Sequence, residues 1–251
     1  MKIQIASDLH LQNSDNWDWV EKHPLEIKGE VLVLAGDIGN LKFPEEYEDF
    51  YNFVEHNFEQ VISINGNHEY YRGEITKKSK RIYEMLAGNH IKLNNQVFNY
   101  GDVRFLATTL WSYVPREFEE KTEKLFNDYH RIKYRGRNLK ARDTNRLNKF
   151  SVNFLQEALD EKFEGKTVIV THHLPSLDLV EQKDEFLFGQ ANNLEDIFAE
   201  HPEIDLWICG HSHKQIDTVI NKTRIVQNSL GYVPEVLPAK MKFDRGFVVE
   251  V

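Results

Sequence analysis

Short apolar runs recur along the chain, and most of their residues are β-branched or aliphatic. They lie at Ile3–Ala6, Val31–Ala35, Val61–Ile64, Val103–Ala107, Thr167–Thr171 and Leu206–Cys209. Runs of this length and composition are typical of buried strands. Between the early runs, Tyr47–Phe58 and Thr76–Leu86 are amphipathic at a helical period. Strands that alternate with helices predict a mainly parallel sheet with helices outside it.

The C-terminal third of the chain has a different rhythm. Three strand-like segments follow one another closely at Gln215–Ile220, Thr223–Gln227 and Gly246–Val251. Asn221-Lys222 suits a turn between the first two. This spacing indicates an antiparallel meander, and a β-sandwich flanked by helices would accommodate both halves of the chain.

A helical pattern replaces the strand pattern between Pro115 and Gly165. Phe118–Tyr129 and Thr144–Phe163 both follow a helical period. The second carries an apolar stripe made of Leu147, Phe150, Phe154, Leu155, Ala158 and Leu159. Gly136 and Asn138 interrupt the pattern between the two segments. We therefore predict an inserted helical hairpin over about residues 115–165.

Composition and charge narrow the class of protein. The chain has 251 residues, 41% of them hydrophobic, and shows no repeat or Pro/Gly/Ser linker, so we expect one domain over residues 1–251. No apolar run reaches membrane-spanning length, and the first residues form a predicted strand rather than a signal peptide. Cys209 is the only cysteine, so we expect a cytoplasmic protein without membrane contact. A net charge of −9 argues against general adhesion to nucleic acid, but it leaves room for a local basic patch.

Polar side chains of the kinds that bind metals follow five of the predicted strands. The clusters are Asp8-Leu9-His10, Gly36-Asp37, Gly66-Asn67-His68-Glu69, His172-His173 and Gly210-His211-Ser212-His213. In an extended segment, residues two apart face the same side, so Asp8 and His10 would reach one metal ion. Ligand sites in α/β sheets lie at the carboxyl ends of strands. One such cluster is usually an ordinary turn, but five of them at strand ends predict a shared site.

In this order, the five clusters resemble the motif set of the calcineurin-like metallophosphoesterases. The resemblance runs from the first strand to the last third of the chain. Asn228–Tyr232 is also similar to a loop that many small family members carry near their end. The resemblance implies an α/β fold, the αββα four-layer sandwich with two mixed β-sheets flanked by helices. It also implies a small bacterial- or phage-type phosphoesterase rather than a protein serine/threonine phosphatase.

The resemblance implies a site for two divalent metal ions. Asp8, His10 and His213 would hold one ion, Asn67, His172 and His211 would hold the other, and Asp37 would bridge the two. Oxygen and imidazole ligands without thiolates suit Mn, Fe or Zn. His68 would donate a proton to the leaving oxygen or stabilise charge on the phosphoryl group. His173, directly after an expected ligand, is expected to lie behind it.

The expected reaction is hydrolysis of a phosphate ester by a metal-bridging hydroxide. Protein serine/threonine phosphatases carry an arginine shortly after the aspartate equivalent to Asp37, and it grips a terminal phosphate. Here Ile38-Gly39-Asn40-Leu41 follows instead. Arg72 is expected to be an exposed loop residue, and the alternative is that it substitutes for the missing arginine. We therefore favour a phosphodiesterase acting on a nucleotide, cyclic nucleotide or short nucleic acid. The alternatives are a phosphomonoesterase or pyrophosphohydrolase on a small molecule and, more remotely, a non-catalytic scaffold.

A basic stretch lies inside the predicted insertion. It consists of Arg131, Lys133, Arg135, Arg137, Lys140, Arg142, Arg146 and Lys149, opposed by Asp143. The simplest interpretation is a solvated helix face, where each charge contributes little. The alternative hypothesis is a lid or rim that binds the non-reacting part of an anionic substrate, such as a nucleotide or nucleic acid. The sequence leaves the physiological substrate, the native metal and the oligomeric state open.

Overall fold

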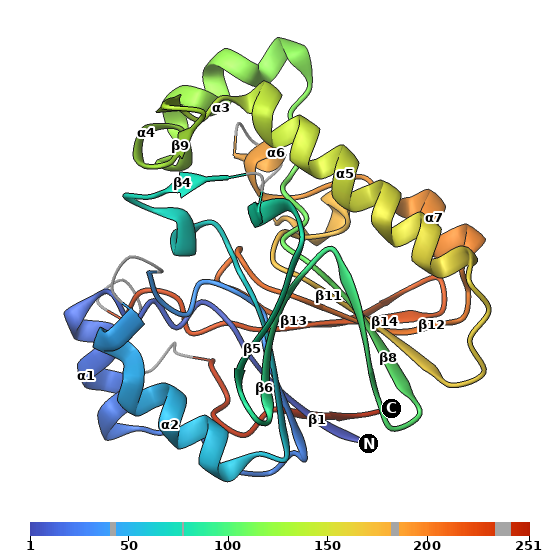
Figure 1. Ribbon diagram of the computed structural model, residues 1–251. Coiled ribbons are helices and arrows are strands. Elements are labelled where there is room, and N and C mark those ends of the chain that lie inside the picture. Colours follow the sequence, from blue (N-terminus) through green and yellow to red (C-terminus); the bar gives the residue numbers. More distant parts are fainter. Residues whose placement is uncertain (41–43, 77, 182–185, 234–241) are drawn as a thin grey trace.

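Two six-stranded β-sheets form the body of the protein (Figure 1). The computed structural model describes residues 1–251 except 41–43, 77, 182–185 and 234–241. The first sheet has the order β15 (Val248–Glu250), β1 (Lys2–Ala6), β2 (Val31–Leu34), β3 (Gln60–Ile64), β6 (His90–Asn94) and β5 (Ile82–Ala87). The second has the order β13 (Gln215–Ile220), β14 (Thr223–Asn228), β12 (Ile204–Cys209), β11 (Lys166–Thr171), β8 (Val103–Thr108) and β7 (Gln96–Tyr100).

Helices cover the outer faces of both sheets. The α-helices are α1 (Ser14–Lys22), α2 (Glu48–Asn57), α3 (Glu119–Leu125), α4 (Asp128–Arg131), α5 (Ala141–Asp160), α6 (Leu187–Gln190) and α7 (Glu195–Glu200). Short 3₁₀ helices span Pro44–Tyr47, His68–Tyr70, Lys78–Lys80, Arg116–Phe118 and Leu177–Leu179. Among the described residues, no helix has the length and apolarity that a membrane crossing requires.

Alternate residues of each strand face different layers of the core. Val31 and Val33 of β2 pack between the two sheets, whereas Leu32 and Leu34 pack against the helices. The second sheet likewise packs its outer face against helices, where Trp207 joins a cluster with residues of α5 and α7. Because both faces of these strands are buried, they read as continuous apolar runs. The result is the expected αββα sandwich.

The predicted strands are confirmed where the sheet is parallel. The six apolar runs correspond to β1, β2, β3, β8, β11 and β12, and neighbouring members of each group pair in parallel. The amphipathic segment Tyr47–Phe58 contains α2. The hairpin of β13 and β14 is also confirmed.

Two predictions about antiparallel elements are wrong. The segment Thr76–Leu86 forms a 3₁₀ turn and then β5, an edge strand that pairs with β6, and its side chains at Tyr83 and Met85 are exposed. Pairing with a neighbouring strand outweighs local helical periodicity here. The C-terminal meander is not formed either, because β15 pairs with β1 in the other sheet. β14 instead pairs in parallel with β12.

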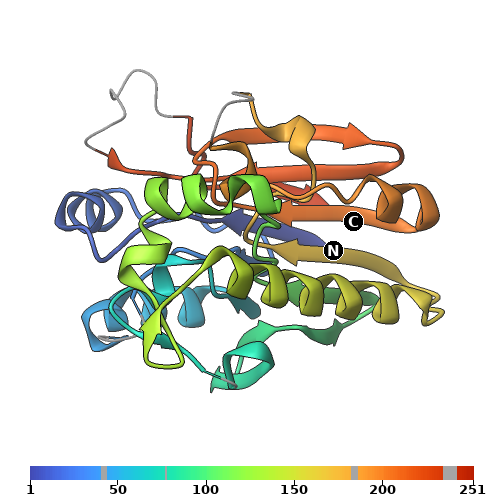
Figure 2. The same ribbon diagram turned by 90° about the horizontal axis from the view of Figure 1, so that it is seen from above.

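The inserted region lies at one end of the sandwich and differs in part from the predicted hairpin (Figures 1 and 2). Its second arm is α5, as expected, but its first arm is broken into α3 and α4. Between α4 and α5 the chain forms β9 (Lys133–Tyr134) and β10 (Arg137–Asn138), turning at Gly136 with φ 76°. β9 also pairs with β4 (Glu74–Ile75), which lies shortly after the Asn67-His68 motif. This small sheet ties the insertion to the predicted site.

Candidate metal centre

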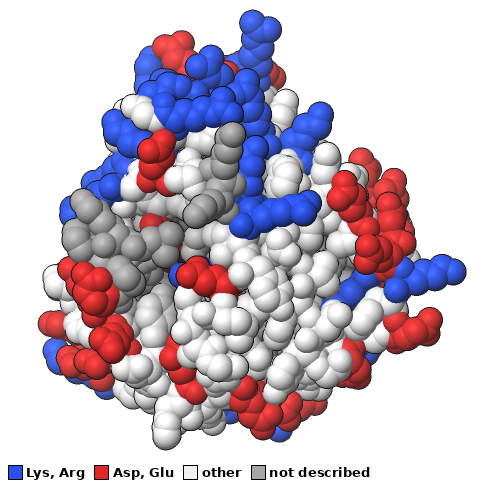
Figure 3. Space-filling view, in the orientation of Figure 1, with Lys and Arg blue, Asp and Glu red and all other residues white. Residues whose placement is uncertain are grey.

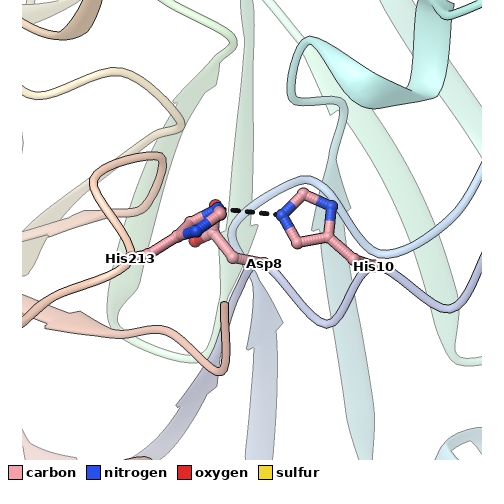
Figure 4. Close-up of side chains that lie close together, drawn as sticks. All are labelled: Asp8, His10 and His213. Atoms are coloured by element: carbon pink, nitrogen blue, oxygen red, sulfur yellow. Dashed lines mark hydrogen bonds and ion pairs between the residues drawn. The ribbon is translucent and has the colours of Figure 1, made fainter. Parts of the chain in front are cut away.

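The structure brings all seven expected ligands together at the carboxyl ends of β1, β2, β3, β11 and β12. The first group of ligands consists of Asp8, His10 and His213 (Figure 4). In it, the Nε2 atoms of His10 and His213 are 2.9 Å apart. The Nε2 atom of His213 lies 3.5 Å from Oδ1 of Asp8. These three side chains form one set whose donor atoms could share a metal ion.

A second set lies on the other side of Asp37. The Asn67 side-chain oxygen is 3.0 Å from Nε2 of His172 and 3.2 Å from Nδ1 of His211. Oδ2 of Asp37 lies 3.4 Å from Nε2 of His172 and 3.9 Å from Nε2 of His10. Asp37 therefore stands between the two sets, where a bridging carboxylate is needed.

The spacing of these atoms fits metal coordination. Ligand atoms bound at roughly 2.1 Å to one ion lie about 3.0–3.4 Å from each other. The contacts within each set fall close to this range. Carboxylate, amide and imidazole donors together suit Mn, Fe or Zn. The residues present thus fit a pair of divalent ions.

The backbone at these ligands is strained. Asp8, His10, Asp37, His211 and His213 all have φ between 48° and 72°, the left-handed region that side chains other than glycine rarely adopt. The extended geometry predicted for Asp8 and His10 is therefore wrong, because neither residue continues the strand in an extended conformation. Each strand ends and the chain turns sharply, which aims alternate side chains at one point. Strain of this kind persists at functional sites because the surrounding packing enforces it.

Two glycines of the motifs are required by space. A Cβ atom on Gly66 would lie 2.2 Å from Oδ1 of Asp37 and 2.7 Å from the His172 ring. A Cβ atom on Gly36 would lie 2.6 Å from Nδ1 of His172. Both glycines therefore allow the backbone to pass close to the ligands.

The surroundings of most expected ligands favour the protonation state that binds a metal ion, which is a carboxylate for Asp37 and a neutral imidazole for His10 and His211. Burial alone would raise the pKa of the Asp37 carboxyl, but the imidazoles of His172 and His68 hold it well below its usual range. Burial lowers the pKa of His10 to about 3 and holds that of His211 well below normal. Burial also opposes charge on His172, yet the Asp37 carboxylate raises the pKa of His172 to about 10. The Asp37 carboxylate thus stabilises positive charge next to it, as expected of a carboxylate that lies between two cations.

Glu69 is a functional residue whose role the sequence did not reveal. Its buried carboxylate accepts hydrogen bonds from the backbone N–H groups of Asp37, Ile38, Gly39 and Gly66 at 2.6–3.2 Å. It therefore holds the turn that carries Asp37 against the turn that carries Asn67. Its place next to His68 was visible in the sequence, but three of the four partners of its carboxylate lie about thirty residues away.

The inserted region reaches the centre through Asp128. Its buried carboxylate accepts a hydrogen bond of 2.8 Å from Nδ2 of Asn67 and one of 2.7 Å from the Tyr71 hydroxyl. Asp128 thereby turns the Asn67 side-chain oxygen toward His172 and His211. A contact over 61 residues leaves no signal in the spacing of the motifs.

His68 lies beside the two ligand sets, and it also forms a third group that could hold an ion with His10 and Asp37. Both of its ring nitrogens have polar contacts. Its Nε2 atom is 3.9 Å from Oδ2 of Asp37 and 3.3 Å from the Tyr232 hydroxyl. Nε2 of Gln12 lies 3.1 Å from its Nδ1 atom, and its ring stacks on Tyr71 with centroids 4.0 Å apart. As placed, the Gln12 amide donates to Nδ1, which leaves the His68 proton on Nε2, the nitrogen nearest Asp37.

The neighbouring histidine has a different setting. His173 is buried, and its Nδ1 lies 3.4 Å from the carbonyl oxygen of Thr109. Its ring packs on that of His211 with centroids 4.2 Å apart. Among the described residues, it belongs to none of the groups that could hold an ion. His173 therefore packs against the His211 ring and helps to hold that ring in place.

Comparison with known proteins agrees with this geometry. A family model described as calcineurin-like phosphoesterase matches residues 1–215, a span that contains all five motifs. The chain belongs to this family. It is therefore a metal-dependent phosphoester hydrolase.

Individual relatives of this phosphoesterase are distant. Uncharacterized protein L509 of Acanthamoeba polyphaga mimivirus is 28% identical over 265 residues, which cover 93% of this chain and 92% of that protein. The 3',5'-cyclic adenosine monophosphate phosphodiesterase CpdA of Escherichia coli K12 is 26% identical over 80 residues, which cover 32% of this chain and 29% of CpdA. The crystal structure of phosphopantetheinyl hydrolase (PptH) from Mycobacterium tuberculosis superposes with a TM-score of 0.71 at 16% identity, covering 99% of this chain and 95% of PptH. This last likeness establishes the shared fold.

Proposed function

We propose that the protein is a two-metal phosphodiesterase that acts on a nucleotide, cyclic nucleotide or short nucleic acid. The observation that carries this proposal is the convergence of two ligand sets on Asp37, with His68 beside them. The segment Ile38–Asn40 after Asp37 offers no cationic side chain for a dianionic phosphate. A diester carries one negative charge and needs less positive charge around it. The short match to a cyclic nucleotide phosphodiesterase points in the same direction.

The ligand sets would divide the two ions between them. Asp8, His10 and His213 would hold one, Asn67, His172 and His211 the other, and Asp37 would touch both. When bound, such a pair neutralises phosphate charge and lowers the pKa of a water molecule for in-line attack. We propose manganese, iron or zinc as the metal, and the single buried cysteine supports the cytoplasm as the compartment.

His68 would donate a proton to the leaving group. Its Nε2 proton is held in place by the Gln12 amide at Nδ1 and by stacking on Tyr71. Its backbone N–H also donates to Oδ1 of Asp37 at 2.8 Å, which fixes the residue relative to the bridging carboxylate. A proton positioned there can be given to the departing oxygen, a contribution of roughly 10²–10⁴ in rate.

The basic stretch supports an anionic partner. Lys and Arg side chains gather over the inserted region with a few Asp and Glu among them, whereas most Asp and Glu of this face lie along its right side and lower part (Figure 3). In a chain of net charge −9, such a patch attracts a negatively charged substrate toward this end of the molecule. We propose that a nucleotide or nucleic acid meets the protein here.

A phosphomonoesterase or pyrophosphohydrolase is the second candidate. It is favoured by two arginines, Arg72 and Arg131, which line the same cavity as His68. Arginine binds a dianionic phosphate with paired hydrogen bonds, as a monoesterase requires.

Assays with the purified protein separate these functions. We expect bis(p-nitrophenyl) phosphate to be hydrolysed with a higher kcat/KM than p-nitrophenyl phosphate, activity to be lost on chelation, and Mn²⁺ to restore it. A preference for the monoester would support the second candidate. A protein that binds no divalent metal and hydrolyses neither ester would be a scaffold.

A further inference from the structure

A cavity of about 300 Å³ opens beside the candidate metal centre. His68, Tyr71 and Tyr232 line the part nearest the ligands. Arg72 and Arg131 also line it, and Glu46 is the one acidic residue among the described residues that line it. The expected proton donor, His68, thus lies in a cavity whose described lining has a net positive charge.

Both arginines have free guanidinium groups. In the described part of the chain, neither forms an ion pair or a side-chain hydrogen bond, whereas Arg137 binds Asp143 through both terminal nitrogens at 2.7 and 2.9 Å. The Arg131 guanidinium rests 5.7 Å from the centroid of the Tyr71 ring, a cation–π contact that leaves its N–H donors unused. Two arginines with unused donors in one cavity form an anion receptor.

Backbone contacts place the two arginines next to each other. The N–H group of Arg72 donates to the carbonyl oxygen of Arg131 at 2.9 Å, and Arg72 has a left-handed φ of 61°. Arg131 ends α4, and Asp128 at the start of the same helix is hydrogen-bonded to Asn67. The backbone positions from which the two exposed arginine side chains extend are therefore fixed relative to an expected metal ligand.

The order of His68, Tyr71 and Arg131 indicates which part of a substrate would reach the two arginines. Tyr71 stacks on His68 on one side and carries the Arg131 guanidinium over its ring. If His68 protonates the departing oxygen, whatever lies beyond His68 belongs to the leaving alcohol. We propose that Arg72 and Arg131 form a subsite for a second anionic group, carried by the leaving alcohol of the substrate. The inference rests on the proposed function and narrows the substrate to phosphate esters whose leaving group bears a phosphate or a similar anion.

A matched set of methyl aryl phosphate diesters tests the subsite by kinetics. The leaving phenol carries a phosphonomethyl, a hydroxymethyl or a trimethylammoniomethyl group, and the scissile bond stays the same. We expect the phosphonomethyl ester to have the lowest KM, and Arg72→Gln or Arg131→Gln to raise that KM about tenfold with kcat retained. The hydroxymethyl ester should be unaffected. Arg116→Gln, which removes an exposed arginine of the inserted region outside the cavity, is the control and should change neither ester.

Two kinetic outcomes would overturn the subsite. Equal losses with the hydroxymethyl and phosphonomethyl esters would mean that the arginines act on the scissile phosphate, as in a monoesterase. No change with either ester would mean that they face solvent without a role in binding.

A binding experiment keeps the subsite testable if diesters are not substrates. Calorimetry on the metal-containing protein compares ethane, propane and butane bisphosphonates with monophosphonates of the same lengths. We expect at least one bisphosphonate to bind more tightly than its monophosphonate, and each arginine variant to remove most of that advantage. This result without diester hydrolysis would retain the subsite and reject the phosphodiesterase proposal. Equal binding of both series by the unaltered protein would reject the subsite.

Discussion

The ligand-bearing edge of the sandwich and the inserted region meet at the same site but are built in different ways. At the sheet edge, the seven expected ligands follow the ends of five strands, and five of them lie in tight turns with a left-handed φ. The insertion instead contributes single residues, Asp128 and Arg131, through a short helix docked from outside. The chemistry of hydrolysis is thus placed by the sheets. Recognition of the substrate, in our proposal, is placed by the insertion.

The basic side chains of the insertion also differ in role, because some stabilise the insertion and another lines the cavity. Arg137 holds the buried Asp143 carboxylate, and Lys140 binds Glu123 at 2.7 Å, so both stabilise the inserted region itself. Arg142 and Lys149 line a different groove, which lies against Tyr113 and Asn192. Of the basic stretch, Arg131 is the member that lines the cavity with His68. A charge run in a sequence can therefore contain residues with unrelated roles.

The largest effect is expected at the sheet edge, from Asp37→Ala. This change removes the carboxylate between the two ligand sets and leaves two cations without a bridge. We expect loss of at least one metal ion per chain and of nearly all turnover, measured by metal analysis and by diester hydrolysis. Two bound ions with a near-normal rate would show that the assignment of Asp37 is wrong.

His68→Ala should separate proton donation from metal binding. We expect both ions to stay bound and kcat to fall by roughly 10²–10⁴. The loss should shrink for esters with very acidic leaving groups, because these depart without a proton. An empty metal site in this variant would instead make His68 a ligand.

Asp128→Ala tests whether the insertion supports the sheet edge. It leaves Nδ2 of Asn67 and the Tyr71 hydroxyl without their shared acceptor. Partners that orient a ligand typically contribute about 10- to 100-fold in metal affinity or activity, so a metal titration should show a loss of this size. Asp128→Asn keeps an acceptor oxygen and should recover much of the affinity. Unchanged affinity in both variants would show that the two regions are independent.

Asp143→Ala should produce the smallest effect, and only on stability. Asp143 accepts from the Lys140 backbone N–H at the start of α5 as well as from Arg137. Losing this cap should lower the free energy of unfolding by about 1–2 kcal/mol, measured by urea denaturation, while KM stays the same. Asp160→Ala at the exposed C-terminal end of α5 is the control. A raised KM in Asp143→Ala would show that this part of the insertion acts in substrate binding as well as in stability.

The sequence by itself determined the parallel strands and the position of each expected ligand at a strand end. Strands buried on both faces have to be apolar throughout, and the carboxyl ends of neighbouring parallel strands meet at one edge. Motifs at those ends could therefore be assigned to one site without knowledge of the turns. The glycines were also visible, although only the contacts around Gly66 show why no larger residue fits.

Tertiary structure decided everything that depends on contacts between distant segments. Thr76–Leu86 became a strand because β6 was available to pair with it, and β15 joined β1 rather than its neighbours in sequence. Asp128 meets Asn67 across 61 positions, and Arg131 reaches the cavity because it ends the helix that Asp128 anchors. Such pairings depend on the folded arrangement of whole elements. A local pattern of residues carries no information about them.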